Sequence, residues 1–397
     1  MEQLSDRILG LSESATIAMS QKSRELKNQG VDVINLSLGE PDFNTPDFVN
    51  YAAKEGIDQN FTKYMPVPGY LDLRQAISKK FKRDNNLDYS VDQIVVSTGA
   101  KQSITNVVLC LINEGDEVLL PAPYWVTYAE IVKLAGGIPV FVDAGIDVDF
   151  KITAEQLQAK TTRNTKLMIY SSPCNPTGTV YSKSELRDIA NYFAENKGVN
   201  VIADEIYEHI TFEGKHESLA QFEDIYDQVI TINGVSKAFA MTGWRVGYMG
   251  APLWIAKACS KMQGQFTSGT CSIGQRAAKA AVEADPLETS YMTEAFDRRR
   301  KLVHNLLLEI PGLKINMPQG AFYFFPDVSF YFGKSDGKST INNSSDLSLY
   351  LLTQANVALV TGDAFGGPNC IRFSYAAADN LLIEAMARIK TALAKLI

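Results

Sequence analysis

The sequence predicts an α/β protein with a large domain built on a mostly parallel sheet and a smaller α+β domain. From about residue 91 onward, short apolar runs rich in β-branched residues alternate with helical stretches. Near-continuous apolar strands separated by helices indicate parallel strands that are buried on both faces. Beyond about residue 285 the pattern changes to long amphipathic helices and a few strands.

The chain of 397 residues is too long for one ordinary core, so two domains are expected. We expect an N-terminal segment, 1–47, that contributes to the small domain, a large domain over 48–288 and a small domain over 289–397. No linker, repeat or low-complexity tract separates these parts, which predicts that they pack closely.

The expected elements of the large domain follow one another in strand–helix order. Each expected strand is an apolar run of 5–10 residues, and each expected helix has apolar positions three or four apart. The strands are expected within 93–100, 116–123, 138–143, 165–173, 200–207 and 228–237, with helices within 101–112, 126–137 and 182–198.

The second part combines two long helices with several strands. Residues 287–310 and 380–396 have helical periodicity, and residues 313–329, 356–365 and 370–376 are expected to be strands. A further apolar strand is expected within 32–43, and it would join this smaller domain.

Composition excludes several classes of function. The net charge of −7, from 45 acidic and 38 basic residues, argues against nucleic acid as the main partner. The longest apolar runs are far too short to cross a membrane, and the N-terminal decapeptide lacks the apolar core of a secretory signal. Five scattered cysteines without CxxC spacing predict neither a disulfide framework nor a metal site. We therefore expect a reduced, cytoplasmic protein.

Only three histidines are available as acid–base groups: His209, His216 and His304. The first two flank a short loop or hairpin, and the third lies in a charged helix. We favour structural roles for all three, which leaves the base to another residue type.

Two ionisable residues stand in apolar surroundings. Lys237 follows a buried strand in "TINGVSKAFAMTGWRVGY", where an unpartnered ammonium is costly unless it loses its proton. It either turns out to solvent or serves as a nucleophile. Asp204 ends the apolar strand of "NVIADEIY", where a helix cap or salt bridge competes with a role as acceptor for a ligand's ring nitrogen.

Other strand ends carry features with two possible interpretations. Gly99 and Ala100 open a helix, which is either an ordinary turn or an anion site at the helix start. Trp125 could pack in the core or stack on a flat ligand. Asn175 could shape its turn or donate to a ligand oxygen, and Arg372 could form an ion pair or bind a carboxylate.

Taken together, these features specify a lysine nucleophile, a carboxylate for a ring nitrogen, an anion cradle, a stacking ring and a carboxylate clamp. That set matches pyridoxal phosphate bound to an amino acid. Binding residues of such folds gather at the carboxyl ends of the strands, where these residues are expected to lie.

Eight motifs carry a resemblance to a known family. They are "LGEPDF", "YMPVPG", "STGAKQ", "PYW", "PCNPTG", "DEIY", "SKAFAMTGWRVG" and "IRFSYA", in this order. The chain resembles the class I, fold-type I pyridoxal-phosphate aminotransferases along essentially its whole length, and it looks closest to the bacterial aspartate aminotransferase subgroup. The resemblance implies a seven-stranded sheet in the large, cofactor-binding domain.

The resemblance also implies roles around the cofactor. Lys237 would form a Schiff base with pyridoxal phosphate and then move the proton between Cα and C4′. Arg245 would bind the phosphate, together with the helix start at Gly99 and Ala100. Asp204 would pair with the pyridine nitrogen.

Further roles concern the ring and the substrate. Tyr207 would hydrogen-bond the 3-hydroxyl of the ring, and Asn175 would support that oxygen and contact the substrate carboxylate. Trp125 would stack on the ring. Arg372 would clamp the α-carboxylate, assisted by the backbone of Gly39.

The remaining implied roles concern the partner subunit, the second carboxylate and the phosphate. Tyr64 would reach the phosphate of the neighbouring subunit, so a homodimer is implied. Lys101 and Ser14 would bind the side-chain carboxylate of the substrate, and Lys101 also belongs to the cofactor-binding helix start. Ser236 would assist at the phosphate, because Gly234 stands where many members carry Ser or Thr.

The resemblance predicts transfer of the amino group of aspartate or glutamate to a 2-oxo acid by a ping-pong mechanism. The alternatives are an aromatic or broad-range aminotransferase, or a C–S lyase, on the same scaffold. Residues 12–13 read Ser–Glu where relatives that use prephenate tend to carry lysine, which predicts weak use of prephenate. A regulatory protein without turnover is disfavoured, and a nicotinamide dehydrogenase is excluded by the missing G-x-G-x-x-G.

Overall fold

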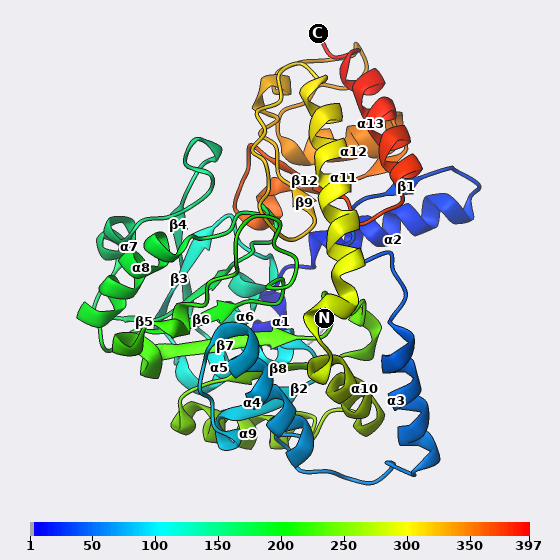
Figure 1. Ribbon diagram of the computed structural model, residues 1–397. Helices are drawn as coiled ribbons and strands as arrows, with labels where there is room; N and C mark the ends of the chain where they lie inside the picture. The colour runs from blue at the N-terminus through cyan, green and yellow to red at the C-terminus, as the bar shows by residue number, and fades with distance from the viewer. Residues whose placement is uncertain (1–3) are drawn as a thin grey trace.

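The computed structural model describes residues 4–397, and its largest element is a seven-stranded sheet (Figure 1). The strand order is β2-β8-β7-β6-β5-β3-β4; β8 runs antiparallel to both of its neighbours, whereas the other pairs are parallel. The strands are β2 (Ile94–Ser97), β3 (Glu117–Ala122), β4 (Ile138–Asp143), β5 (Thr165–Ser171), β6 (Asn200–Asp204), β7 (Val229–Gly234) and β8 (Gly247–Gly250). The predicted mostly parallel, seven-stranded sheet is confirmed.

Helices cover both faces of this sheet. One hydrophobic core lies under α4 (Leu71–Asn85), α8 (Lys183–Glu195) and α10 (Ser272–Glu283), with α3 (Asp47–Asp58) and α7 (Ala154–Lys160) at its margin. A second core lies under α5 (Ala100–Leu111), α6 (Thr127–Leu134) and α9 (Leu253–Phe266). Because both faces are buried, the central strands carry apolar residues at nearly every position.

Local signals in the sequence set several helix starts. Thr153 and Ser182 each accept a hydrogen bond from the backbone N–H three residues later, and Gln156 and Glu185 return the bond. Such capping boxes satisfy backbone donors that the first helical turn leaves free. The helix predicted within 182–198 therefore begins directly after Ser182.

The C-terminal part forms a second, smaller layer, and α11 runs toward it from the level of the large sheet (Figure 1). Its core is aromatic and aliphatic, and β1 pairs in parallel with β10, so the N-terminal segment joins this layer. Its elements are α11 (Ser290–Leu308), α12 (Ser344–Gln354), α13 (Asp379–Leu393), β9 (Tyr323–Phe324), β10 (Val357–Ala358), β11 (Val360–Thr361) and β12 (Ile371–Ser374).

The N-terminal segment contributes α1 (Asp6–Leu9), α2 (Ala15–Asn28) and β1 (Ile34–Asn35). Its first three residues lie outside the described part of the chain. The boundaries after residues 47 and 288 stay a prediction.

The C-terminal strands are shorter than the sequence predicts. Of the strand expected over 313–329, only Tyr323 and Phe324 form a strand, which pairs with β12, and the remaining pairing is limited to isolated bridges at Lys314, Gly320 and Asp327. Pro318 and Pro326 have no N–H to donate, which limits regular pairing on either side. The run 356–365 divides into β10 and β11, which belong to different sheets.

Two expectations from composition concern cysteines and membranes. All five cysteines are free thiols. Among residues 4–397, no helix combines the length and apolar character that crossing a bilayer requires.

Candidate active site

A cavity of about 250 Å³ opens at the edge where β5, β6 and β7 end. Parallel strands bring the residues that follow them to one edge, which is where ligands bind in open α/β sheets. Most of the predicted site residues line this cavity: Ser14, Gly39, Ala100, Lys101, Trp125, Asn175, Asp204, Tyr207, Ser236, Lys237, Arg245 and Arg372.

Two of the predicted site residues do not line the cavity. Gly99 lies directly behind the cavity wall, where a Cβ would come within 2.4 Å of the Arg245 guanidinium. Tyr64 is 98% exposed in the single chain and does not line the cavity.

Asp204, the last residue of β6, is 5% exposed. Its Oδ2 accepts a hydrogen bond from the Tyr128 hydroxyl at 2.6 Å, and its Oδ1 accepts one from the Ile206 N–H at 3.3 Å. Burial raises the pKa of this carboxyl to about 6. Because no cation pairs with it within residues 4–397, the salt-bridge alternative is not what the structure contains.

Lys237 lies three residues after β7, and its ammonium donates to the Gly39 carbonyl at 2.5 Å. The side chain is half-buried and borders the cavity. Desolvation lowers the pKa of Lys237, the negative charge of Glu40 opposes this shift, and the positive charges of Arg372 and Arg245 add to it, so that the pKa falls to about 8. The ammonium has therefore not turned out to solvent.

Arg372 is a buried cation that pairs with no carboxylate within residues 4–397. Its side chain is 1% exposed, its Nη1 donates to Asn175 Oδ1 at 3.0 Å, and its Nη2 donates to the Ser37 carbonyl. Its Nε has no partner within residues 4–397. A buried guanidinium bonded only to neutral oxygens is costly, so the arrangement suits an anionic ligand rather than an internal ion pair.

A second anion site is formed by Arg245 and the start of α5. Gly99 precedes that helix with φ of +82° and supplies no side-chain cap, so the first backbone N–H groups stay available. Arg245 itself adopts a left-handed conformation, with φ of +56°, and donates to the Thr242 carbonyl at 2.9 Å. A non-glycine residue held in this region is uncommon and typical of sites under functional constraint.

Trp125 and Lys101 form the next part of the wall. The Lys101 ammonium lies 4.8 Å from the centre of the Trp125 ring. Burial, followed by the positive charge of Arg245, lowers the pKa of Lys101. Ser14, at the start of α2, borders the same cavity.

The cavity also contains residues that sequence reasoning missed. Tyr323 contacts the Tyr207 hydroxyl at 2.8 Å, and a Cβ at Gly39 would lie 2.0 Å from its oxygen. Tyr128 binds Asp204, and Ser171 and Thr242 complete the wall. Tyr323 and Tyr128 stand among other apolar and aromatic residues, so no local signal marks their hydroxyls.

The glycine that departs from the family pattern has a steric reason. Gly234 pairs with Gly247 across β7 and β8, and a Cβ at position 234 would lie 3.0 Å from the Gly247 Cα. A serine or threonine there would press on the Gly247 Cα and the Val246 carbonyl oxygen, so the neighbouring backbone would have to shift by a few tenths of an ångström. Ser236 borders the cavity instead.

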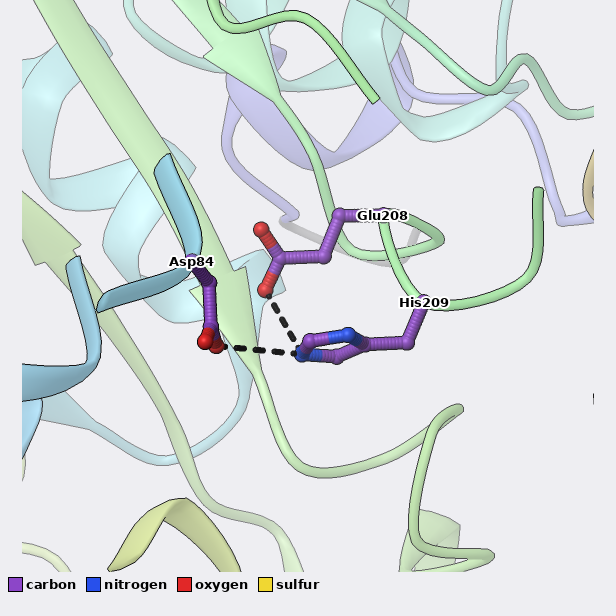
Figure 2. Close-up of side chains that lie close together, drawn as sticks. All are labelled: Asp84, Glu208 and His209. Carbon is purple, nitrogen blue, oxygen red and sulfur yellow. Dashed lines mark ion pairs between the residues drawn. The ribbon is translucent and has the colours of Figure 1, made fainter. Parts of the chain in front are cut away.

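The histidines lie away from the cavity. The His209 Nε2 is 3.1 Å from Glu208 and 3.6 Å from Asp84 (Figure 2), and the His216 Nε2 is 3.0 Å from Glu205. His304 stacks on Phe324.

Three ligand-type atoms of Asp84, Glu208 and His209 lie within 4.8 Å of one another, as a metal site requires. However, the Lys80 ammonium contacts Glu208 and lies 3.7 Å from Asp84. A cation already fills the position that a metal would take, so we assign no metal to this cluster.

The geometry can be compared with known proteins. Residues 31–389 match the family described as aminotransferase class I and II. The chain is 47% identical to a bifunctional aspartate aminotransferase and glutamate/aspartate-prephenate aminotransferase of Petunia hybrida, over 98% of this chain and 82% of that protein.

Two solved structures are similar along almost the whole chain. The aspartate aminotransferase from Rhizobium meliloti superposes with a TM-score of 0.96 and 38% identity, covering 100% of both chains. The aspartate aminotransferase from Thermus thermophilus with maleate superposes with a TM-score of 0.93 and 37% identity, covering 99% of this chain and 100% of that one.

Proposed function

The chain belongs to the class I and II aminotransferases, and from this premise we propose that it moves the α-amino group of L-aspartate or L-glutamate to a 2-oxo acid, with pyridoxal phosphate as its cofactor. One observation carries the proposal. Four cationic side chains border a single cavity, and within residues 4–397 none of them pairs with a carboxylate: Lys101, Lys237, Arg245 and Arg372. A phosphate and two substrate carboxylates are the anions that would neutralise this excess.

The residues present fit pyridoxal phosphate. The phosphate would lie against Arg245 and the start of α5, where the absence of a side chain at Gly99 lets the Arg245 guanidinium approach the helix start. Asp204 offers a buried carboxylate for the ring nitrogen, and Trp125 offers a flat surface for the ring. When bound, the cofactor supplies an electrophilic carbonyl carbon and a pyridinium ring that withdraws electrons from the substrate.

The chain's own residues would orient the cofactor and move protons. Asp204 would hold the proton on the ring nitrogen, because a cation beside a buried carboxylate favours its ionised form. Tyr207 would donate to the 3-oxygen of the ring, with Asn175 beside it. Lys237 would move the proton at the substrate α-carbon, because a pKa of about 8 leaves a substantial neutral fraction that can accept it.

Other residues would select the substrate. Arg372 would bind the α-carboxylate in a two-pronged contact, assisted by Asn175 and the backbone of Gly39. Lys101 and Ser14 would bind the second carboxylate of aspartate or glutamate. A substrate without that carboxylate would leave the Lys101 charge unpaired, which is the basis of the proposed preference.

The proposed functional unit is a homodimer. Tyr64 is almost fully exposed in the single chain, as a residue that completes a neighbouring site would be. We place its hydroxyl at the phosphate of the partner subunit. A cytoplasmic location stays a prediction from cysteine usage.

The test compares amino donors with the purified protein loaded with pyridoxal phosphate. With 2-oxoglutarate as acceptor, aspartate should react faster than phenylalanine, and cystathionine should release no thiol. Faster turnover of phenylalanine would favour the aromatic alternative, and thiol release would favour the lyase. Prephenate as acceptor should react slowly, because Ser12 and Glu13 offer no cation to a further carboxylate.

A further inference from the structure

Tyr128 touches Asp204 directly, although no motif in the sequence predicts it. It lies on α6, three residues after Trp125, and its side chain is buried. Its hydroxyl donates to Asp204 Oδ2 at 2.6 Å, which is the length of a hydrogen bond from a hydroxyl to an ionised carboxylate. The Trp125 and Tyr128 rings meet edge to face, with centroids 5.5 Å apart. One helical turn therefore presents both the stacking ring and the partner of Asp204.

We propose that Tyr128 is a positioning residue for the cofactor: its hydroxyl keeps the Asp204 carboxylate ionised and turned toward the ring nitrogen. The inference rests on the proposed function, since it assigns Asp204 to pyridoxal phosphate. With Oδ2 bound by Tyr128 and Oδ1 bound by the Ile206 N–H, rotation of the carboxylate would break a bond on either side.

Opposing contributions set the pKa of Asp204, so the loss of one hydroxyl donor would change its protonation. Burial raises the pKa of this carboxyl, whereas the Tyr128 and Ile206 hydrogen bonds and the charge of Lys237 lower it. Glu205, next in the chain, raises it. Removing the Tyr128 donor would move the pKa of Asp204 above about 6 and leave more of the carboxyl neutral near pH 7.

The other groups around this pair are neutral near pH 7. Burial raises the pKa values of Tyr207 and Cys174, which face Asp204 and Tyr128 respectively. The buried Ser171 hydroxyl, on the strand paired with β6, has no partner within residues 4–397 and lies beside the Tyr128 hydroxyl. It is free to donate to the Tyr128 oxygen. No second cation on these elements could replace the bond from Tyr128.

The experiment measures the dissociation constant of pyridoxal phosphate against pH for the wild-type chain and for Tyr128→Phe. Near pH 7 the variant should bind about tenfold more weakly, the order expected for losing one hydrogen bond to a charged group. In the wild-type chain the affinity should fall as pH drops through about 6, and in the variant this fall should begin at higher pH.

The matched control is Tyr89→Phe. Tyr89 is equally buried, and its hydroxyl bonds Thr231 at 2.9 Å, outside the cavity. Both variants lose one buried hydroxyl contact and keep the ring. Tyr89→Phe should leave cofactor affinity and its pH dependence unchanged.

A double-mutant cycle with Asp204→Asn separates positioning from general packing. If Tyr128 acts through the carboxylate, Tyr128→Phe should change cofactor affinity little in the Asp204→Asn background. Equal losses in both backgrounds, or an unchanged affinity in the single variant, would overturn the assignment while leaving the proposed function intact. If the wild-type chain itself failed to bind pyridoxal phosphate, the proposed function would fall, and this assignment with it.

Discussion

Residues 204–208 carry two sets of polar side chains that the protein treats in opposite ways. Asp204 and Tyr207 border the cavity, where the carboxylate accepts from a hydroxyl and a backbone N–H and forms no ion pair within residues 4–397. Glu205 and Glu208 lie outside the cavity lining and are paired. Glu205 accepts from the Ser218 hydroxyl at 2.7 Å and lies beside the His216 ring.

Both carboxylate oxygens of Glu208 have a partner. Lys80 contacts one of its oxygens, and Asn85 donates to the other at 2.7 Å. His209 lies between Glu208 and Asp84 (Figure 2). Although burial favours the neutral form, the charges of Lys80 and His209 hold the pKa of Glu208 well below its usual range.

An unpaired carboxylate occurs in this segment at the cavity, whereas the buried carboxylates outside the cavity lining are paired. A buried ion with every partner present contributes to a unique structure, whereas a buried ion without one is stabilised only when a ligand completes it. The unpaired charges that line the cavity therefore lower the stability of the ligand-free chain and favour the binding of a ligand that pairs with them.

Substitution of Lys237, which borders the cavity, and of the buried Lys80 should have opposite consequences. Lys237→Ala should lower the rate of transamination by about 10⁴-fold or more, because the group that moves the proton is lost. It should not destabilise the cofactor-free chain, because it removes an ammonium that pairs with no carboxylate within residues 4–397. An assay of the transamination rate measures the first effect, and urea unfolding of the same sample measures the second. Retained turnover would contradict the role of Lys237.

Lys80→Met should instead destabilise the chain by about 3–5 kcal/mol, the cost of leaving one member of a buried pair uncompensated. The Lys80 side chain is 2% exposed, and its loss leaves Glu208 and Asp84 without their shared cation. The free energy of unfolding in urea measures the effect. Activity per folded molecule should be unchanged.

The control for Lys80 is Lys82→Met on the same helix. The Lys82 side chain is 54% exposed and pairs with Asp88 at 2.7 Å in solvent. Its loss should change the free energy of unfolding by no more than about 1 kcal/mol. Equal effects at positions 80 and 82 would remove the distinction between buried and exposed pairs.

Asp204→Asn should stabilise the cofactor-free chain above about pH 6. The folded-state pKa of about 6 lies above the usual 3.8, so the folded chain disfavours the ionised carboxylate as pH rises through this range. The gain should approach about 3 kcal/mol, at about 1.36 kcal/mol per pKa unit, and should vanish below about pH 4. Thermal melts at several pH values measure it.

Glu208→Gln should show the opposite sign. Because the folded-state pKa of Glu208 is depressed, its contribution to stability is present above the unfolded pKa and is lost as pH falls through the folded value. The variant should therefore be less stable than the wild-type chain at neutral pH, with the gap closing in acid. If both substitutions changed the stability at neutral pH in the same direction, the contrast between the unpaired Asp204 and the paired Glu208 would be contradicted.

Lys101→Met should alter substrate preference more than overall activity. We expect the ratio of kcat/KM for aspartate to that for phenylalanine to fall about tenfold, equal to about 1.4 kcal/mol of lost carboxylate binding. Phenylalanine serves as the internal reference, because it has no second carboxylate. Equal losses for both substrates would place Lys101 with the cofactor rather than with the substrate.

Much of the site could be predicted because parallel strands deliver the residues that follow them to one edge of the sheet. Asp204 at the end of β6 and Lys237 after β7 stand out as ionisable residues in apolar runs. The sheet order and the short C-terminal strands could not be predicted in the same way. They depend on pairings between distant segments, such as β1 with β10.

The residues that the sequence did not reveal owe their roles to packing. Tyr128 has the pattern of a core residue on an amphipathic helix, and only the approach of α6 to the end of β6 brings its hydroxyl to Asp204. Lys80 stands in a run of charged residues on α4. Its burial depends on which face of that helix meets residues 205–209, and helical periodicity alone does not define the partner.

The most direct test is an absorbance spectrum of the chain loaded with pyridoxal phosphate, before and after adding aspartate without any oxo acid. We predict that the band of the lysine-bound cofactor is replaced by that of its amine form, and that Lys237→Ala lacks the first band. An unchanged band with aspartate, converted instead by phenylalanine, would contradict the role of Lys101. Absence of any cofactor band after reconstitution would contradict the assignment of Lys237 and the claim that the unpaired charges await this ligand.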